Sequence, residues 1–337
     1  MPSPTSKSRP SGKFPWASLS DGDLMQVRLK DLHVAVEGTW LEEQLDQLHE
    51  TLGQRGIDVR LHAWISDEWF SPDSTPGIAI PFYLTHPRLM RLERKMILEV
   101  EGGNARDCQR ILRHEAGHVV QNAFQLHRRK KWQELFGRSS QRYPRYYRPN
   151  PASKHFVQHL RLWYAQAHPD EDFAETFAVW LKPRSDWRER YADWPALKKL
   201  EYVDKLMTEI AGQTPVLTHR AAVDPLSKLT RTLAEHYDRK QAFYASESPR
   251  IYDRDLLRIF SESPRHSGAS NPISASARPR KSRRNPRPDG FARTTAGDAG
   301  RNAGCAGWAD NAWDRAWRKA QTVAASGAGA ATDRHAA

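Results

Sequence analysis

The chain has 337 residues, of which 39% are hydrophobic and 27% charged, and a formal net charge of +12 at pH 7. This length is enough for a substantial core. No apolar run approaches the roughly 18 residues of a membrane-spanning helix, and the first twenty residues contain no signal-peptide core. Cys108 and Cys305 are too far apart for a CxxC pattern, which argues against a disulfide framework. A cytoplasmic location is therefore expected.

The positive charge is concentrated near the C-terminus. From Pro264 onward, 13 Lys and Arg stand against 5 Asp and no Glu, and residues 292–337 contain no Leu, Ile or Phe. Such a composition cannot build a core. We expect a disordered N-terminus over residues 1–20, one folded domain over 21–262, and a disordered, low-complexity basic tail over 263–337. The tail could bind polyanions without sequence preference.

The N-terminal elements begin with a helix over 39–56, where leucines recur at three- and four-residue spacing. Residues 57–65 alternate as in a strand. Residues 77–84 predict a second strand, and Pro81 places it at a sheet edge. An extended peptide substrate could pair with that edge, although a purely structural strand fits the pattern equally well.

The remaining elements are mainly helical. A helix is expected to begin at Ala105 or Arg106, and residues 127–154, rich in Arg, Tyr and Pro, predict a loop. Basic and aromatic residues in this loop could bind nucleic acid. We favour instead a partly exposed loop over an active-site cleft, because it lies directly between the helix that begins near residue 105 and the helix predicted over 169–181. Its basic rim could suit acidic substrates. Further helices are predicted over 154–166, 169–181, 194–212, 224–244 and 252–260, the fourth starting with Asp224 as N-cap and Pro225.

One short motif carries most of the chemistry. Residues 114–118 read HEAGH, so that His114 and His118 lie one turn apart on the same face of a helix. Two imidazoles in this arrangement can bind one Zn²⁺, and Glu115 beside them can act as a general base. The alternative is a satisfied histidine pair on a half-buried helix.

A catalytic zinc requires a third protein ligand. The HExxHxxGxxH arrangement is excluded, because its last histidine is replaced by Phe124. Glu171 and Glu175 instead share a face of a later helix. We expect Glu171 to ligate the metal and Glu175 to accept the second ring N–H of a ligand histidine. Asp172 and Glu175 are rivals for the third ligand, and a solvated acidic face is the alternative reading.

The segments ILRHEAGHVVQNA and LWYAQAHPDEDFAETFAVWL resemble a bacterial family of putative zinc-binding metallopeptidases of the gluzincin kind. The second segment is also similar to the metal-binding helix of the lethal factor protease domain. These resemblances imply a zincin-like fold, zinc bound by Glu171, and assistance to catalysis by Tyr164. Tyr164 could equally be an aromatic packed beside Trp163. His168 is a weaker candidate for the same role, and we expect it to have a local structural role, because it precedes Pro169 at a helix start.

The fold class expected is α+β and zincin-like, with a small, partly antiparallel sheet, an active-site helix and a mainly helical C-terminal part. The expected function is that of a zinc metallopeptidase, a hydrolase acting on peptides or proteins. One Zn²⁺ would be held by His114, His118 and Glu171, although these ligands also suit other divalent ions. The alternatives are a catalytically silent zinc-binding interaction module and, third, a nucleic-acid-associated protein.

Overall fold

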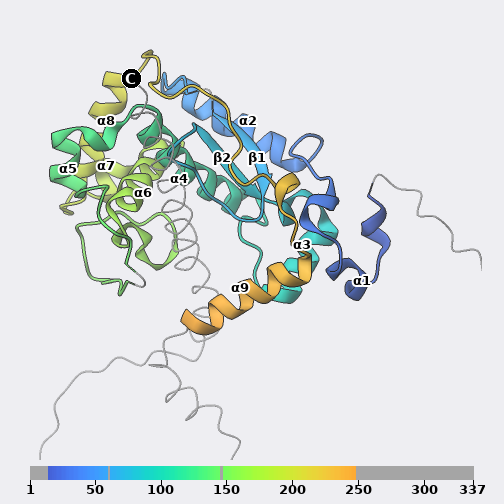
Figure 1. Ribbon diagram of the computed structural model, residues 1–337. Coiled ribbons are helices and arrows are strands. Elements are labelled where there is room, and N and C mark those ends of the chain that lie inside the picture. The colour runs from blue at the N-terminus through green and yellow to red at the C-terminus, as the bar shows by residue number, and fades with distance from the viewer. Residues whose placement is uncertain (1–13, 60, 145–146, 248–337) are drawn as a thin grey trace, which may run out of the picture. The chain divides into compact units, whose positions relative to one another are not determined.

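The computed structural model describes residues 14–59, 61–144 and 147–247. They form a mixed, helix-dominated fold with one two-stranded sheet (Figure 1). The α-helices are α1 (Asp21–Met25), α2 (Trp40–Gln54), α3 (Pro87–Ile97), α4 (Ala105–Ala123), α5 (Lys130–Phe136), α6 (Pro169–Leu181), α7 (Trp187–Arg190), α8 (Leu197–Ile210) and α9 (Leu233–Glu247), and the strands are β1 (His62–Ser66) and β2 (Gly77–Pro81). Short 3-10 helices cover Pro15–Ser18, Leu29–Leu32, Phe82–Thr85, Leu126–Arg128, Arg161–Gln166 and Leu226–Lys228.

Helix α4 lies at the centre of this arrangement. It packs against α2 and β2 on one side and against α6 on the other, and α6 in turn packs against α8 (Figure 1). The helix begins at Ala105, within the predicted range, because the Asn104 side chain accepts a hydrogen bond from the Asp107 backbone N–H. Every residue from His114 to Ala123 is buried, so that the motif lies inside the core.

The two strands run parallel, with His62 paired to Gly77 and Ser66 to Pro81. The predicted antiparallel pairing is therefore wrong for these strands. Among the described residues, antiparallel pairing occurs only as isolated bridges, Phe70 with Ala79 and Arg28 with Thr232. The reason is the path of residues 67–76, which return along the sheet and bridge to β2 before the chain enters that strand.

Residues 67–76 also occupy one edge of β2, the edge at which residues 77, 79 and 81 present their backbone groups. Ala79 exchanges both backbone hydrogen bonds with Phe70, and the Gly77 N–H bonds to the Thr75 carbonyl. Pro81 has no N–H to offer. Little of this edge remains for an extended peptide, and the structure gives no support to substrate pairing along it.

Several predicted boundaries need correction. Residues 15–18 form a 3-10 helix with Trp16 buried, so that order begins before residue 20. Of the helix predicted over 154–166, only a kinked 3-10 turn from Arg161 is present, with Leu162 and Trp163 in the left-handed region. The loop predicted over 127–154 contains α5. Asp224 has φ 45°, and the helix predicted to start there begins at Leu233. The helix predicted over 252–260 and the tail lie outside the described residues.

Helix α9 contacts α1 and α3 and is anchored by buried charge. The Lys240 ammonium lies 2.8 Å from Glu68 Oε1 and 3.0 Å from Glu93 Oε1. Arg231, shortly before α9, pairs with Asp67. The segment beyond α8 is therefore fixed to the start of the connection between β1 and β2. No helix in the described part of the chain is long and apolar enough to cross a membrane.

Candidate metal centre

The close approach of α4 and α6 brings the candidate ligands together. A Cβ atom placed on Gly117 would lie 2.8 Å from Ala174 Cα, so that a side chain at this position would force the two helices apart. Helix α6 begins with Pro169, and the His168 ring accepts a hydrogen bond from the Asp170 backbone N–H. Gly117 thus fixes the distance between the helices, and the His168 cap fixes where α6 begins.

Three donor atoms from these helices converge. His114 Nε2 lies 3.2 Å from His118 Nε2 and 3.1 Å from Glu171 Oε2, and His118 Nε2 lies 3.2 Å from the same Glu171 oxygen. Ligands about 2.0–2.1 Å from a tetrahedral Zn²⁺ are separated from one another by about 3.3 Å. All three residues are buried and form a group that could hold a metal ion. The donor types and their separations fit zinc.

The hydrogen bond between His114 and Glu175 explains why one nitrogen of this histidine points into the cluster. Its Nδ1 lies 3.0 Å from Glu175 Oε1. Because a carboxylate accepts, Nδ1 carries a proton, and Nε2 is therefore the ring nitrogen that a metal could bind in place of a proton. The other Glu175 oxygen accepts from the backbone N–H groups of His159 and Leu160. Glu175 therefore fixes the orientation of the His114 ring.

The electrostatics of the cluster favour a cation. Burial disfavours the charged form of His114, but the hydrogen bonds that its ring donates to Glu171 and Glu175 outweigh this effect and raise the pKa of His114 to about 9. Burial by itself would raise the pKa of Glu175. The hydrogen bond from His114 and the nearby histidines have the larger combined effect, so that the pKa is lowered. Two buried carboxylates thus stabilise positive charge between them.

Tyr143 is a member of the site that the sequence did not reveal as such. Its hydroxyl donates a 3.0 Å hydrogen bond to Glu171 Oε1, the oxygen not directed at the histidines. Its ring stacks on His168 with centroids 3.7 Å apart, and His168 Nε2 donates to the Gln141 carbonyl. Burial and the Glu171 charge raise the pKa of Tyr143 well above its usual value, so that it remains a donor. In the sequence it was only one aromatic of a basic loop.

The other candidate residues have clear positions. Glu115 is buried on α4, and its backbone carbonyl accepts from Ser71 Oγ. Tyr164 is buried with its ring centroid 5.6 Å from that of His114. Asp172, a rival of Glu171, points instead to Lys199, whose ammonium lies 2.5 Å from Asp172 Oδ2. His168 acts as the cap of α6, its predicted local role.

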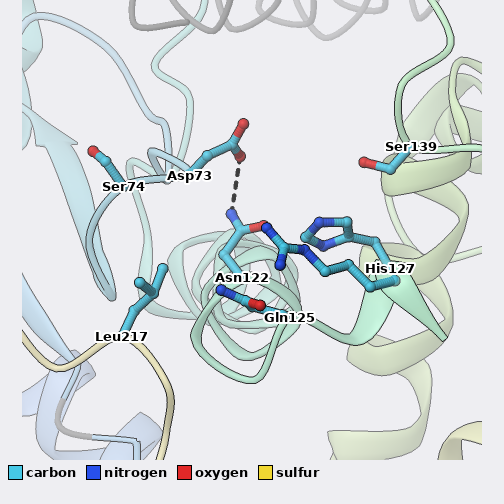
Figure 2. Close-up of a pocket in the computed structure, with 8 residues that line it drawn as sticks. Asp73, Ser74, Asn122, Gln125, His127, Ser139 and Leu217 are labelled. Atoms are coloured by element: carbon cyan, nitrogen blue, oxygen red, sulfur yellow. Dashed lines mark hydrogen bonds between the residues drawn. The ribbon is translucent and has the colours of Figure 1, made fainter. Parts of the chain in front are cut away.

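A pocket of about 410 Å³ lies at the C-terminal end of α4. Figure 2 shows Asp73, Ser74 and Leu217 on one side, His127 and Ser139 on the other, and Asn122 with Gln125 between them. Arg128 also lines it. Asn122 Nδ2 donates a 3.0 Å hydrogen bond to Asp73 Oδ1, which ties the connection between the strands to α4.

Two packed helices that present two imidazoles and a carboxylate to one point define a candidate metal-binding protein. Residues 105–211, from the start of α4 to just beyond α8, match the model of a family described as "Putative zinc-binding metallo-peptidase". The matched region includes the histidine pair, Glu115, Glu171 and Glu175. No curated protein and no solved structure matches the chain.

Proposed function

We propose that this protein is a zinc-dependent metallopeptidase of the gluzincin type, with a zincin-like arrangement around one Zn²⁺ held by His114, His118 and Glu171. The observation that carries the proposal is the triangle of donor atoms with sides of 3.1–3.2 Å, with two of these atoms on α4, which also bears Glu115, and the third on α6. The match of this region to a family of zinc-binding metallopeptidases supports the same conclusion.

Each residue of the site has a separate role in the proposed peptide hydrolysis. A bound Zn²⁺ supplies a Lewis acid that polarises the substrate carbonyl and lowers the pKa of the attacking water. Glu115 takes the proton from that water and passes it to the leaving amine. Tyr164 donates a hydrogen bond to the oxyanion. Glu175 fixes the His114 ring, and Tyr143 fixes the Glu171 carboxylate by holding its other oxygen.

A catalytically silent zinc-binding module is the second candidate, and the burial of the cluster favours it. The most exposed of the three donor side chains is His118, at 7%. Structural zinc sites are closed, whereas catalytic sites keep a position for water and substrate. In a silent module Glu115 would be dispensable and the histidines would not.

The test compares metal content and peptidase activity in three variants of the full chain. We expect one equivalent of zinc in the wild type and in Glu115→Gln, and none in His118→Ala. Cleavage of an unbiased peptide pool should occur only in the wild type. His155→Ala, which changes an exposed histidine, is the matched control and should keep both properties.

Two outcomes would contradict the peptidase. Zinc retained by the wild type without any cleavage would favour the silent module. Absence of zinc from the wild type would exclude both candidates and leave a buried histidine pair.

The remaining proposals concern residues that the described structure does not test. We propose a cytoplasmic enzyme whose catalytic domain ends near residue 262 and is followed by a basic tail over 263–337 that binds polyanions non-specifically. Such binding would weaken steeply with salt and would be lost on truncation after Phe260.

A further inference from the structure

The backbone groups that hold Glu175 belong to a segment without regular secondary structure. Glu175 Oε2 accepts a 2.8 Å hydrogen bond from the Leu160 N–H and a 3.3 Å one from the His159 N–H. Residues 157–160 lie in neither a helix nor a strand, so that no ladder of backbone hydrogen bonds fixes the direction of these two N–H groups. Contacts made by side chains must therefore hold the segment if Glu175 is to keep one position.

Arg110 and His159 form a reciprocal pair that ties this segment to α4. Arg110 Nη2 donates a 2.5 Å hydrogen bond to the His159 carbonyl, and His159 Nε2 lies 2.9 Å from the Arg110 carbonyl. Because a carbonyl only accepts, His159 Nε2 carries a proton and donates it. Arg110 lies one turn before His114 on the same helix. The pair thus connects the segment that holds Glu175 to the helix that presents His114.

Further contacts support the pair on one side and the segment on the other. Arg110 Nη1 lies 3.4 Å from Asp107 Oδ1, and the other oxygen of Asp107 accepts from Asn104, the cap of α4. Beyond α7, the buried Tyr191 hydroxyl accepts a 3.0 Å hydrogen bond from the Gln158 backbone N–H. The segment is therefore held from two sides, and Arg110 is the contact that comes from the helix bearing the histidine pair.

We infer that Arg110 is a positioning residue of the proposed metal centre, which acts through the His159 backbone on Glu175 and through Glu175 on the His114 ring. The inference rests on the zinc site of the proposed function and adds to it a residue that does not touch the metal ligands. With Arg110 in place, two N–H groups face Glu175 Oε2, and Oε1 stays directed at His114 Nδ1. Without the guanidinium, the segment can shift and the His114 ring loses its fixed orientation.

The test measures the zinc affinity of the full chain by competition with a chromophoric chelator, in a double-mutant cycle with Glu175. Arg110→Met should weaken zinc binding about 3- to 10-fold, less than the roughly 10- to 100-fold loss expected when a residue in direct contact with a ligand is changed. In the Glu175→Gln background the same change should alter the affinity less than about 2-fold, because its effect passes through the Glu175 carboxylate.

Three further variants separate positioning from a general structural role. Arg110→Lys keeps a donor for the His159 carbonyl and should recover most of the lost affinity. Arg106→Met, an exposed change one turn earlier on α4, is the matched control and should bind zinc like the wild type. His159→Leu removes the other bond of the pair, should weaken zinc binding in the same way as Arg110→Met, and provides the test if Arg110→Met does not fold. Urea unfolding of each variant shows that affinity is compared between folded proteins.

Two results would overturn the inference and leave the proposed function intact. One is a zinc affinity of Arg110→Met and His159→Leu equal to that of the wild type. The other is a loss of equal size with and without the Glu175 carboxylate, which would mean that Arg110 does not act through it. A wild type that binds no zinc would overturn the inference and the proposed function together, whereas zinc binding without cleavage would count against the peptidase alone.

Discussion

The cluster around Lys240 and the cluster around His114 each bury two glutamates, but they balance the negative charge differently. Between Glu68 and Glu93 lies the Lys240 ammonium, within 3.0 Å of an oxygen of each. Between Glu171 and Glu175 lies the His114 ring, one nitrogen facing each carboxylate.

The two clusters differ in whether the positively charged side chain can also act as a metal ligand. An ammonium has three donors and no lone pair, so that it closes an ion pair by itself. The His114 ring donates one N–H to each carboxylate, but a metal can displace the Nε2 proton, because metal ligands bind in their deprotonated form. The freed lone pair would then lie beside the donor atoms of His118 and Glu171. The first cluster is suited to hold α9 in place, and the second is suited to receive a metal.

Among the changes considered, removal of the Lys240 ammonium should lower the stability of the protein most. Lys240→Met leaves two buried carboxylates without their counter-charge and should lower the free energy of unfolding by about 3–5 kcal/mol, measured by urea denaturation at pH 8. Arg239→Met, a change at the exposed neighbouring position, is the control and should cost little. A loss below about 1 kcal/mol for Lys240→Met would mean that the cluster does not anchor α9.

A methyl group between α4 and α6 should damage the second cluster without touching its ligands. Gly117→Ala places Cβ 2.8 Å from Ala174 Cα and should destabilise the protein by about 1–3 kcal/mol through overpacking. Zinc affinity should fall in parallel, because the donors move apart. Gly53→Ala, on the exposed face of α2 with nothing near its Cβ, should be neutral or slightly stabilising. Unchanged affinity in Gly117→Ala would show that helix spacing does not set the site.

Glu175→Gln removes one negative charge from the His114 cluster and keeps the shape of the side chain, and so tests the role of that charge in metal binding. The amide cannot hold the His114 ring as a carboxylate does, and zinc affinity should fall about 10- to 100-fold, measured by competition with a chromophoric chelator. Glu201→Gln, on the exposed face of α8, should bind zinc like the wild type. An affinity equal to that of the wild type would exclude Glu175 as the residue that orients His114.

The Lys240 cluster should also leave a signature in the pH dependence of stability. Burial raises the pKa of Glu68 from 4.5 to about 7, although Lys240 opposes the shift. The native state then holds a proton that the unfolded state releases, so that this carboxyl lowers stability as pH rises from about 4.5 to about 7.

Glu68→Gln should remove this decline, which a shift from 4.5 to about 7 makes about 3 kcal/mol, and leave the protein more stable than the wild type at pH 8. The measurement is urea unfolding at pH 4.5, 6 and 8. A difference between variant and wild type that does not change with pH would contradict the raised pKa.

The histidine pair and the two glutamates could be predicted from the sequence because both depend on the spacing within a single helix. Spacing at i and i+4 places His114 with His118, and Glu171 with Glu175, whatever the rest of the fold does. Tyr143 could not be found in this way. Its contact with Glu171 depends on the path of a loop and on the His168 ring beneath it.

The elements that were mispredicted are those in which tertiary contacts override local pattern. Asp224 and Pro225 form a typical helix start, but Asp224 lies in the left-handed region and only a 3-10 turn, Leu226–Lys228, follows. The Asp224 carbonyl accepts from Ser66 Oγ, and the Leu29 N–H bonds to the Arg231 carbonyl before α9 begins. In the same way, β1 and β2 have an alternating pattern that does not specify their relative direction, and the path of residues 67–76 makes them parallel.

The spacing of His118 and Glu171 along the chain has a consequence for folding. They are 53 residues apart, and Cys108 is a buried free thiol, so that no disulfide joins the described parts of the chain. A metal bound by both residues would act as a cross-link that closes this long loop, and a cross-link of such length reduces the entropy of the unfolded chain by the equivalent of about 4 kcal/mol. Removal of such a metal by a chelator would then remove a cross-link between α4 and α6 as well as a cofactor, and these two helices would be the first to separate.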